Sequence, residues 1–375
     1  MVDHVEACTG CSACLSACPF KAITFARSYD GFMVPRVDKK LCKDCGICDR
    51  VCPLNSTAGK RDEIKYYAVQ NRNLNQRKTS QSGGLFSAVA SVVLAEGGVC
   101  YGAGFVNGFK VAQTRVNSLE DICKLQGSKY VQSDPNATFQ MAEEDLKQGK
   151  LVLYSGTSCL IAGLYSYLSL RKVDTENLMT CDLICHGVPS PKMWDDNIKL
   201  QIQKHGNLKA AKFRDKKFGW HSSKESYLFE SGEEISEAYY TDLFYSHAAL
   251  RTGCYNCHYA KNECKPADIT MADFWGISGT KIDLKDDNTG ISLAVTHTKK
   301  GNELLEKSDL TIIEIDAQAA MLNNMKTSPK PPKWRENFWK DYEKHGYEYC
   351  LKKYSIYGGI PFKIKRRILK QLGVW

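Results

Sequence analysis

Several features that would assign this 375-residue chain to a common class are absent. No stretch reaches the roughly 20 apolar residues that a membrane-spanning helix needs. The longest apolar-rich run, residues 83–98, contains an acidic residue and lies between glycine pairs. The N-terminal residues lack the positive start and apolar stretch of a signal peptide. We therefore expect a cytoplasmic protein without a transmembrane segment.

Motifs of several enzyme classes are also missing. The chain has no GxGxxG after a first strand, no P-loop and no GxSxG element, so neither a standard dinucleotide fold nor a serine nucleophile is supported. The net charge is +9, but the basic residues are scattered, and we expect no nucleic-acid partner. Residues 361–375 hold five Lys or Arg and no acid. This segment predicts a solvated amphipathic helix, or else a docking surface for an acidic electron carrier or an anionic membrane.

Cysteine, by contrast, is abundant: the chain has 17. Disulfides are disfavoured in a reducing compartment, so metal or cluster ligation is the stronger explanation. Eight of these residues form two copies of one run, C-x2-C-x2-C-x3-C-P, and each cysteine of the second copy follows its partner by 34 residues. The first copy holds Cys8, Cys11, Cys14 and Cys18, and the second holds Cys42, Cys45, Cys48 and Cys52.

This run is typical of bacterial ferredoxins with two four-iron clusters, in which the fourth cysteine binds the other cluster. The pattern therefore predicts two [4Fe–4S] clusters with crossed ligands. One set is Cys8, Cys11, Cys14 and Cys52, and the other is Cys42, Cys45, Cys48 and Cys18. Structural zinc is the weaker alternative, because zinc sites show two CxxC pairs across a longer loop.

The order of predicted elements divides the chain into three parts. Residues 1–58 read as an α+β ferredoxin-like dicluster domain, with a hairpin between the two cysteine runs and a polar linker near residue 56. Residues 59–325 alternate strand and helix, which favours a larger α/β domain with a largely parallel sheet. Within it, residues 118–127 are predicted to be helical. Residues 326–375 form a basic helical extension that either covers the core or pairs with a second copy.

The larger part contains further cysteines, two of which lie at the ends of predicted strands. Cys159 lies where a strand turns into a helix, and Cys185 lies where the next strand ends. Parallel strands place such ends at one sheet edge, so these thiols are expected to be close. With the CxxC pair Cys254 and Cys257 they predict a third metal or cluster site, with Cys264 in reserve; the alternative is ordinary buried cysteine. The isolated residues are expected only to pack: Cys100, Cys123, Cys181 and Cys350.

Several stretches of the larger part resemble the beta subunit of coenzyme F(420) hydrogenases and dehydrogenases. They are "SQSGGLFSAVASVVLAEGGVCYGAGF", "GSKYVQSD", "LYSGTSCLIAGL", "CDLICHGVPSP", "FRDKKFGW" and "CYNCHYAKNECKPADITMADFWGI". The resemblance implies a flavin, usually FAD, and a third [4Fe–4S] cluster held by Cys159, Cys185, Cys254 and Cys257. For the flavin it points to Ser82, Gly83, Gly84, Ser128, Lys129, Tyr130 and Gln132.

The chain departs from the family pattern at three positions. Ser158 and Leu160 flank Cys159 where the family has proline and glutamine, and Cys264 replaces a basic residue that relatives often carry. The segment around Arg214, Lys216, Lys217 and His221 is a candidate for binding an anionic substrate, with Trp220 able to stack on a planar ring. His186 could relay protons beside Cys185.

Together these patterns predict an iron–sulfur flavoprotein oxidoreductase. Electrons would pass between a ferredoxin or other redox carrier protein, the clusters and the flavin, with hydride exchange to a deazaflavin or another small-molecule substrate. Two alternatives stay open. One is an electron-transfer subunit that supplies a partner enzyme, for example in surface polysaccharide synthesis. The other is a binding or scaffold module in which only the ferredoxin part is redox active.

Overall fold

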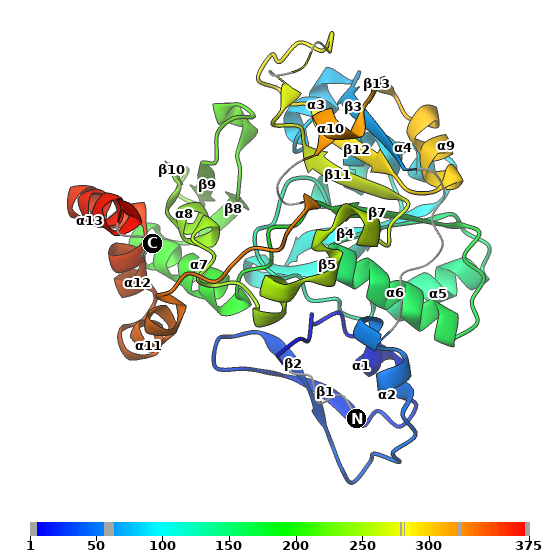
Figure 1. The fold of residues 1–375 in the computed structure, drawn as a ribbon, viewed down its shortest axis with the longest axis horizontal. Coiled ribbons are helices and arrows are strands. Elements are labelled where there is room, and N and C mark those ends of the chain that lie inside the picture. The colour runs from blue at the N-terminus through cyan, green and yellow to red at the C-terminus, as the bar shows by residue number, and fades with distance from the viewer. Residues whose placement is uncertain (1–5, 56–63, 278–279, 281, 322–324, 372–375) are drawn as a thin grey trace.

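The structure is a computed structural model, and it describes residues 6–55, 64–277, 280, 282–321 and 325–371. The predicted linker near residue 56 falls outside these residues. Within the described ranges, no helix is long and apolar enough to cross a membrane. Figure 1 shows three regions: an N-terminal domain, a large sheet with its helices, and a helical region that carries the C-terminus.

The N-terminal domain consists of two short helices and a hairpin. Helix α1 spans Ala13–Ala17, and helix α2 spans Ile47–Arg50. Strands β1 (Ile23–Arg27) and β2 (Met33–Val37) pair antiparallel between them, which confirms the predicted hairpin. A 3-10 turn, η1, follows at Pro53–Asn55.

The hairpin tip packs on the rest of the protein. Ser190 Oγ donates to the Asp30 carbonyl at 2.5 Å, and a Cβ on Gly31 would approach the Lys192 Cβ to 2.3 Å. Gly31 has a φ of +84°, so both its conformation and its close approach require glycine. The arm thus joins the domains.

The large domain is built on one eight-stranded sheet of order β13-β3-β12-β11-β7-β6-β4-β5. In chain order its strands are β3 (Lys65–Asn71), β4 (Val99–Val106), β5 (Lys110–Val116), β6 (Val152–Ser155), β7 (Leu178–Leu183), β11 (Ile269–Asp273), β12 (Ser292–Thr296) and β13 (Leu310–Ile315).

The prediction of a largely parallel sheet is wrong. Only the central strands β11, β7, β6 and β4 run parallel, and the other four pairings are antiparallel. The short turn η2 (Asn107–Phe109) between β4 and β5 accounts for one of these pairings, since so short a connection can only join antiparallel strands.

Helices cover both faces of the sheet. Alternate residues of β6 show the division: Leu153 packs with α4 (Leu85–Ala95) and α9 (Lys299–Lys307). Tyr154 instead packs with α5 (Thr138–Lys147) and α6 (Ser158–Leu170), together with helix α1, which carries Cys14. The dicluster domain therefore belongs to the core on one face of the sheet. Two short helices complete this domain: α3 (Leu74–Thr79) and α10 (Ala317–Ala320).

The predicted helix at residues 118–127 is instead a 3-10 turn, η3 (Glu120–Lys124). Gly127 ends this segment with a φ of +79°, and the chain then enters a loop. The sequence pattern was compatible with a helix, but the chain turns here to bring residues 128–132 against the sheet.

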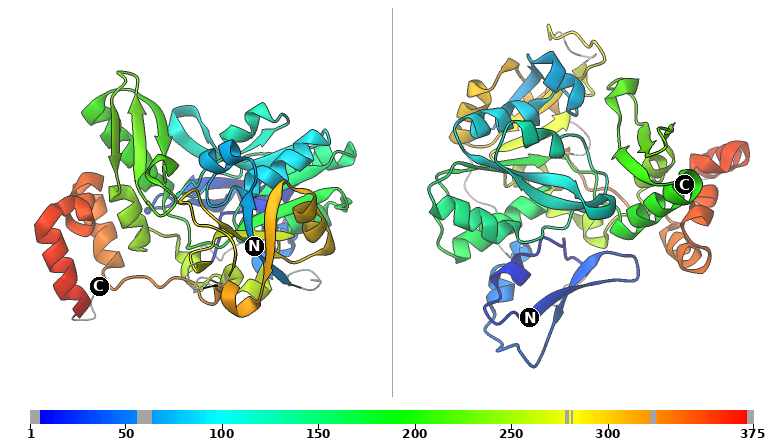
Figure 2. Two further views of the ribbon diagram at one scale, coloured as in Figure 1. Left: turned by 90° about the horizontal axis from the view of Figure 1, so that it is seen from above. Right: turned by 180° about the vertical axis from the view of Figure 1, so that it is seen from behind.

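A second sheet and its helices form a separate hydrophobic core that the sequence did not predict. Strands β8 (Leu208–Lys212), β9 (Glu225–Phe229) and β10 (Glu234–Glu237) are antiparallel. They share this core with α7 (Pro191–His205), α8 (Tyr239–Tyr245) and the C-terminal helices α11 (Arg335–His345) and α12 (Tyr347–Tyr354). The last helix, α13 (Gly359–Gln371), packs on α12. Trp194, Tyr227 and Phe338 share this core. The C-terminal helices α11 and α12 thus complete a core begun by residues 191–250 (Figure 2).

Candidate iron–sulfur and cofactor site

The two cysteine runs adopt the same backbone conformation. Gly10 and Asp44, which are 34 residues apart, both have positive φ, as do Ser12 and Gly46 at the same separation. Positive φ at Asp44 and Ser12 is uncommon for residues other than glycine. The repeat in sequence is therefore a repeat in structure.

Four thiols of the first predicted set lie together. Burial, together with the charges of Cys8 and Cys52, raises the pKa of Cys14 to about 12. Burial likewise raises the pKa of Cys11, to which the charges of Cys14 and Cys8 contribute. Such buried, mutually repelling thiolates are stabilised by a cationic iron–sulfur core. The grouping agrees with the crossed assignment, although Cys48 also adds to the electrostatic environment of Cys14.

The second predicted set lines a cavity of about 170 Å³ in the dicluster domain. Its thiols are Cys18, Cys42, Cys45 and Cys48. The Ala22 N–H points to Cys18 Sγ at 3.4 Å, and the Gly10 N–H points to Cys8 Sγ at 3.4 Å. Backbone donors to sulfur are the interactions that tune a cluster once it is bound.

The third predicted set is assembled by the fold. Cys159 begins α6 just after β6, and Cys185 follows β7, which pairs parallel with β6. Cys254 lies in the 3-10 turn η5 (Thr252–Asn256), and Cys257 follows it. Burial, together with the charges of Cys159 and Cys185, raises the pKa of Cys257 to about 12. The expected proximity of Cys159 and Cys185 is confirmed, and both Cys254 and Cys257 join them.

A buried lysine accompanies this third set. Lys265 is 2% exposed, and its Nζ donates to Ser158 Oγ and to the Leu183 carbonyl, both at 2.8 Å. Its charge partly opposes the effect of burial on the pKa of Cys185. The serine that replaces the family's proline thus provides an acceptor for this ammonium. Two further 3-10 turns, η6 (His258–Ala260) and η7 (Asn262–Cys264), connect η5 to Lys265.

A site for a single metal ion would need several ligand side chains to converge on one point. Among the residues that the structure describes, no three His, Cys, Asp or Glu side chains converge on one metal ion. A four-iron cluster binds its four cysteines at separate irons, so its ligands need not converge on one point. Of the isolated cysteines, Cys100, Cys181 and Cys350 are buried in the cores as expected, but Cys123 is exposed.

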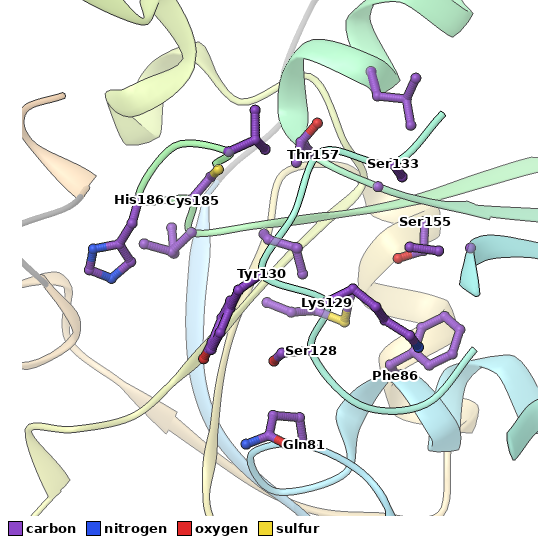
Figure 3. A pocket seen from close by; sticks show the side chains of 18 of the residues that line it. Gln81, Phe86, Ser128, Lys129, Tyr130, Ser133, Ser155, Thr157, Cys185 and His186 are labelled. Atoms are coloured by element: carbon purple, nitrogen blue, oxygen red, sulfur yellow. The ribbon is translucent and has the colours of Figure 1, made fainter. Parts of the chain in front are cut away.

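A cavity of about 310 Å³ lies between the sheet edge and the dicluster domain. Cys11 from the first set lines it, as do Cys159 and Cys185 from the third. Figure 3 shows Ser128, Lys129 and Tyr130 on one loop of its wall, with Cys185 and His186 on another. The cavity therefore borders two of the three thiol sets.

Most of the predicted flavin residues line this cavity: Ser82, Ser128, Lys129, Tyr130 and Gln132. Gly83 and Gly84 are not among the lining residues. A Cβ on Gly83 would come within 2.6 Å of the Val69 carbonyl oxygen, and Gly84 has a φ of +80° at the start of α4. Packing against β3 and backbone conformation thus explain these glycines without a ligand.

Gln132 has a second role. Its Nε2 donates to the Thr9 carbonyl at 2.9 Å, and its Oε1 accepts from Arg251 Nη1 at 2.9 Å. Arg251 also donates to the Cys8 carbonyl at 2.5 Å and to the Met33 carbonyl at 3.0 Å. These bonds join the dicluster domain to the large domain, so the Gln132 amide is already engaged.

Lys129 and Gln113 carry unusual polar groups into the cavity wall. Burial lowers the pKa of Lys129 to about 7, and its Nζ donates to the Gln126 carbonyl at 2.6 Å. Gln113 is 1% exposed, and its buried Oε1 has no hydrogen-bond partner within the described structure. Sequence reasoning missed Gln113, since a single glutamine in a strand has no motif.

The predicted substrate-binding segment is largely committed to internal contacts. Arg214 Nη1 pairs with Asp273 Oδ2 at 2.7 Å, and Trp220 Nε1 donates to Asp273 Oδ1 at 2.6 Å. Lys216, in the short turn η4 (Lys216–Phe218), donates to the Ser82 carbonyl at 2.6 Å. The expectation that Trp220 stacks on a ligand is wrong: Trp220 is fully buried and stacks on Trp275 with ring centroids 4.8 Å apart.

Trp275, not Trp220, lines the cavity, and it is 47% exposed. His221 pairs with Asp286 at 2.7 Å, and Lys217 pairs with Glu234. His186 lines the cavity, and burial together with the charge of His247 lowers its pKa to about 4. His186 is therefore neutral near pH 7.

Comparisons with known proteins agree with the two-part architecture. Residues 7–56 match the family described as the 4Fe-4S dicluster domain. Residues 149–319 match the C terminus of the coenzyme F(420) hydrogenase/dehydrogenase beta subunit. The class is thus an iron–sulfur protein in which a dicluster domain precedes a beta subunit domain. The predicted resemblance to coenzyme F(420) hydrogenase/dehydrogenase beta subunits is confirmed over residues 149–319, and the predicted dicluster domain is confirmed over residues 7–56.

Individual relatives are distant. A curated protein, the F subunit of F(420)H(2) dehydrogenase from Methanosarcina mazei, is 23% identical over 144 residues, which cover 36% of this chain and 41% of that protein. The chain thus matches about two fifths of the length of this relative. A chain of the F(420)-reducing nickel–iron hydrogenase complex from Methanosarcina barkeri aligns with a TM-score of 0.48 and 18% identity, over 81% of this chain and 95% of that one.

Proposed function

We propose that this chain is an iron–sulfur, flavin-dependent oxidoreductase. It passes electrons between a ferredoxin-type carrier and a small-molecule substrate. One observation carries the proposal: a single cavity is lined by Cys11 of the dicluster domain, by Cys159 and Cys185 of the third thiol set, and by the loop at residues 128–130. A ligand in this cavity would be in reach of both sets.

The cavity wall suits a flavin in its chemistry. The unpaired Gln113 Oε1 is an acceptor that a ligand N–H would satisfy, because a buried polar atom without a partner is costly. The Lys129 ammonium would favour a ligand with negative charge. Phe86 and Tyr130 add aromatic surface to the wall. A bound flavin would supply the exchange between hydride and single-electron chemistry.

The clusters would form the route to this cavity. Cys8, Cys11, Cys14 and Cys52 would hold one cluster, Cys18, Cys42, Cys45 and Cys48 the second, and Cys159, Cys185, Cys254 and Cys257 the third. Cys11 and Cys159 lie close enough for the charge of Cys159 to affect the pKa of Cys11. A Cβ on Gly163 of α6 would come within 2.9 Å of Cys11 Sγ, so this glycine permits the approach.

The substrate side of the cavity is organised by Asp273. It accepts from Ser82 Oγ at 2.5 Å, besides Arg214 and Trp220, and so holds this wall in place. Trp275 lines the cavity, with Trp220 stacked on its ring and Arg214 over it at 5.3 Å from the centroid. A cavity wall that is ordered by these hydrogen bonds favours an enzyme with its own substrate over the alternative of an electron-transfer subunit. The deazaflavin or another planar organic molecule would be the substrate.

Anaerobic purification tests the proposal. We expect a flavin absorbance spectrum, release of FAD on denaturation, and about twelve irons per chain. Ser128→Trp should fill part of the cavity and remove the flavin while the iron content is retained. Ser231→Trp, on the exposed β9–β10 turn, is the matched control and should keep both.

The substrate is tested by reducing the protein with dithionite and adding candidate acceptors. Reoxidation of the flavin by the deazaflavin would support hydride exchange with coenzyme F(420) as the activity. A preparation with the full iron content but no flavin, in wild type and after incubation with FAD, would refute the flavin-dependent function.

A further inference from the structure

The outermost C-terminal helix, α13, presents a stripe of isoleucines to solvent. Ile360, Ile364 and Ile368 are 72%, 57% and 50% exposed. Residues spaced by four lie on one face of a helix, so the three side chains form one continuous apolar strip. Soluble surfaces carry single exposed hydrophobic residues without consequence, but an aligned set points to an interaction.

The strip is not the face by which α13 is attached to the protein. Phe362 is 4% exposed, and Arg366 Nη1 pairs with Asp242 Oδ1 of α8 at 2.8 Å. These contacts hold the opposite side of the helix against the second core. In Figures 1 and 2, α13 lies at an outer edge of the molecule, away from the dicluster helices α1 and α2. The isoleucines are therefore displayed by the fold.

The charge of the helix identifies the surface that fits it. Five of its thirteen residues are basic and none is acidic: Lys363, Lys365, Arg366, Arg367 and Lys370. Arg367 is exposed, whereas Arg366 is engaged with Asp242. A strip of isoleucine needs an apolar medium, and the basic residues need anions beside it.

We propose that α13 lies in the surface of an anionic lipid bilayer and docks the protein there. Helices with an apolar strip and a Lys- and Arg-rich remainder bind at the boundary between head groups and acyl chains. Anionic lipids attract such basic segments within a Debye length of the surface. An acidic protein would match the charges but would leave the isoleucines without an apolar medium. The inference rests on the surface of α13 alone and is independent of the proposed flavin chemistry.

Vesicle binding by the full-length, cluster-loaded protein tests the proposal. The probes are vesicles of phosphatidylcholine alone and of phosphatidylcholine mixed with phosphatidylglycerol. We expect the protein to float with the mixed vesicles at low salt and to be released as salt is raised. The triple variant Ile360→Ser, Ile364→Ser, Ile368→Ser should bind more than about tenfold more weakly, because three buried side chains are lost from the interface.

Matched variants separate the two contributions. Leu119→Ser removes a comparably exposed apolar side chain, 46% exposed beside η3, and should bind like the wild type. Arg367→Gln should weaken binding by several fold, whereas Lys209→Gln, which removes one exposed charge from β8, should not. Circular dichroism and iron content confirm that each variant is folded and loaded.

Three outcomes would overturn the proposal. Equal binding to both kinds of vesicle would show that anionic lipid is not recognised. Equal binding of the triple isoleucine variant and the wild type would show that the strip does not insert. Absence of vesicle binding, together with a wild-type dimer that the triple variant abolishes in light scattering, would assign the strip to a second copy of the chain.

Discussion

The dicluster domain and the third thiol set present the same chemical groups by different means. In the dicluster domain, eight cysteines fall within residues 8–52, and local turns bring them together. In the third set, Cys159 and Cys257 are almost a hundred positions apart and meet only because β6 and β7 pair in parallel and η5 folds over their ends. The first arrangement is a property of a segment, and the second is a property of the whole sheet.

This difference affects what each set depends on. The turns of the dicluster domain need small residues that can adopt positive φ, such as Gly10, Ser12 and Gly46, and the repeated sequence supplies them. The third set needs the packed sheet and a buried cation, Lys265, whose contacts with Ser158 and Leu183 come from distant parts of the chain. Substitutions that act on one set and spare the other are therefore the sharpest tests.

The largest effect is expected from removing one thiol of the third set. Cys254→Ser should lose one cluster, about four irons of twelve, because the other thiols cannot hold it alone. The absorbance and electron paramagnetic resonance of the dicluster domain should persist, since its ligands are local. Iron and sulfide analysis of anaerobically purified protein measures this.

The control for this substitution is Cys123→Ser, which removes an exposed thiol outside all three sets. It should leave the iron content unchanged. If Cys254→Ser retained all the iron of the wild type, the third set would consist of ordinary packing cysteines and would not bind a cluster.

The next effect concerns the residue that joins the two regions. Arg251 is 3% exposed and donates to carbonyls of Cys8 and Met33 and to Gln132. Arg251→Met should lower the free energy of unfolding by about 3 kcal/mol, because buried acceptors lose their donors. Denaturant unfolding followed by cluster absorbance measures the loss.

Arg27→Gln is the matched control, since Arg27 pairs with Asp195 at the exposed edge of the same interface. An exposed ion pair contributes less than about 1 kcal/mol, so this variant should unfold nearly as the wild type does. Equal losses in both variants would show that Arg251 is not the principal connection between the domains.

The extent to which the sequence predicted the molecule follows the same division. The cysteine repeat, the hairpin between its copies and helices such as α4 and α6 were predictable, because they depend on local spacing and periodicity. The meeting of Cys159 with Cys185 was predictable from the rule for parallel strands. The antiparallel outer strands were not, since the strand pattern does not specify which neighbour a strand will take.

Within the candidate site, residues were missed where their role comes from burial. Gln113, Asp273 and Lys265 lie far apart in sequence from the groups they serve. Asp273 and Lys265 fall within a stretch that resembles the family, but no spacing rule assigns them a role. Trp220 was interpreted as a ligand-stacking residue, whereas the fold buries it and leaves Trp275 at the cavity. Which of the two tryptophans is exposed is decided by tertiary packing, which the local sequence does not specify.

A smaller effect is expected on the midpoint potential of the third cluster, but not on the potentials of the dicluster domain. Lys265→Met removes the buried ammonium beside the third set and should lower the midpoint potential of that cluster by roughly 50–100 mV, because a nearby positive charge favours the reduced form. Redox titration monitored by electron paramagnetic resonance measures it, and the dicluster signals serve as the internal reference. Lys265→Arg, which keeps the charge, should restore most of the potential; an unchanged potential in Lys265→Met would reduce Lys265 to a packing role.

The smallest effect is a pH dependence at the cavity between the regions. Burial lowers the pKa of Lys129 from 10.5 to about 7, so the folded protein without a ligand gains stability as pH rises between these values and is insensitive to this group below them. Burial favours the neutral form of Lys129, whereas a bound anionic ligand favours the charged form. FAD added to flavin-free protein should therefore bind more tightly at pH 6 than at pH 8.5, by up to about tenfold, as measured by quenching of flavin fluorescence. Lys129→Met should flatten this profile, and Lys129→Arg should keep the tighter binding at pH 8.5. A Met variant with the wild-type slope would assign the titration to another group in the cavity wall.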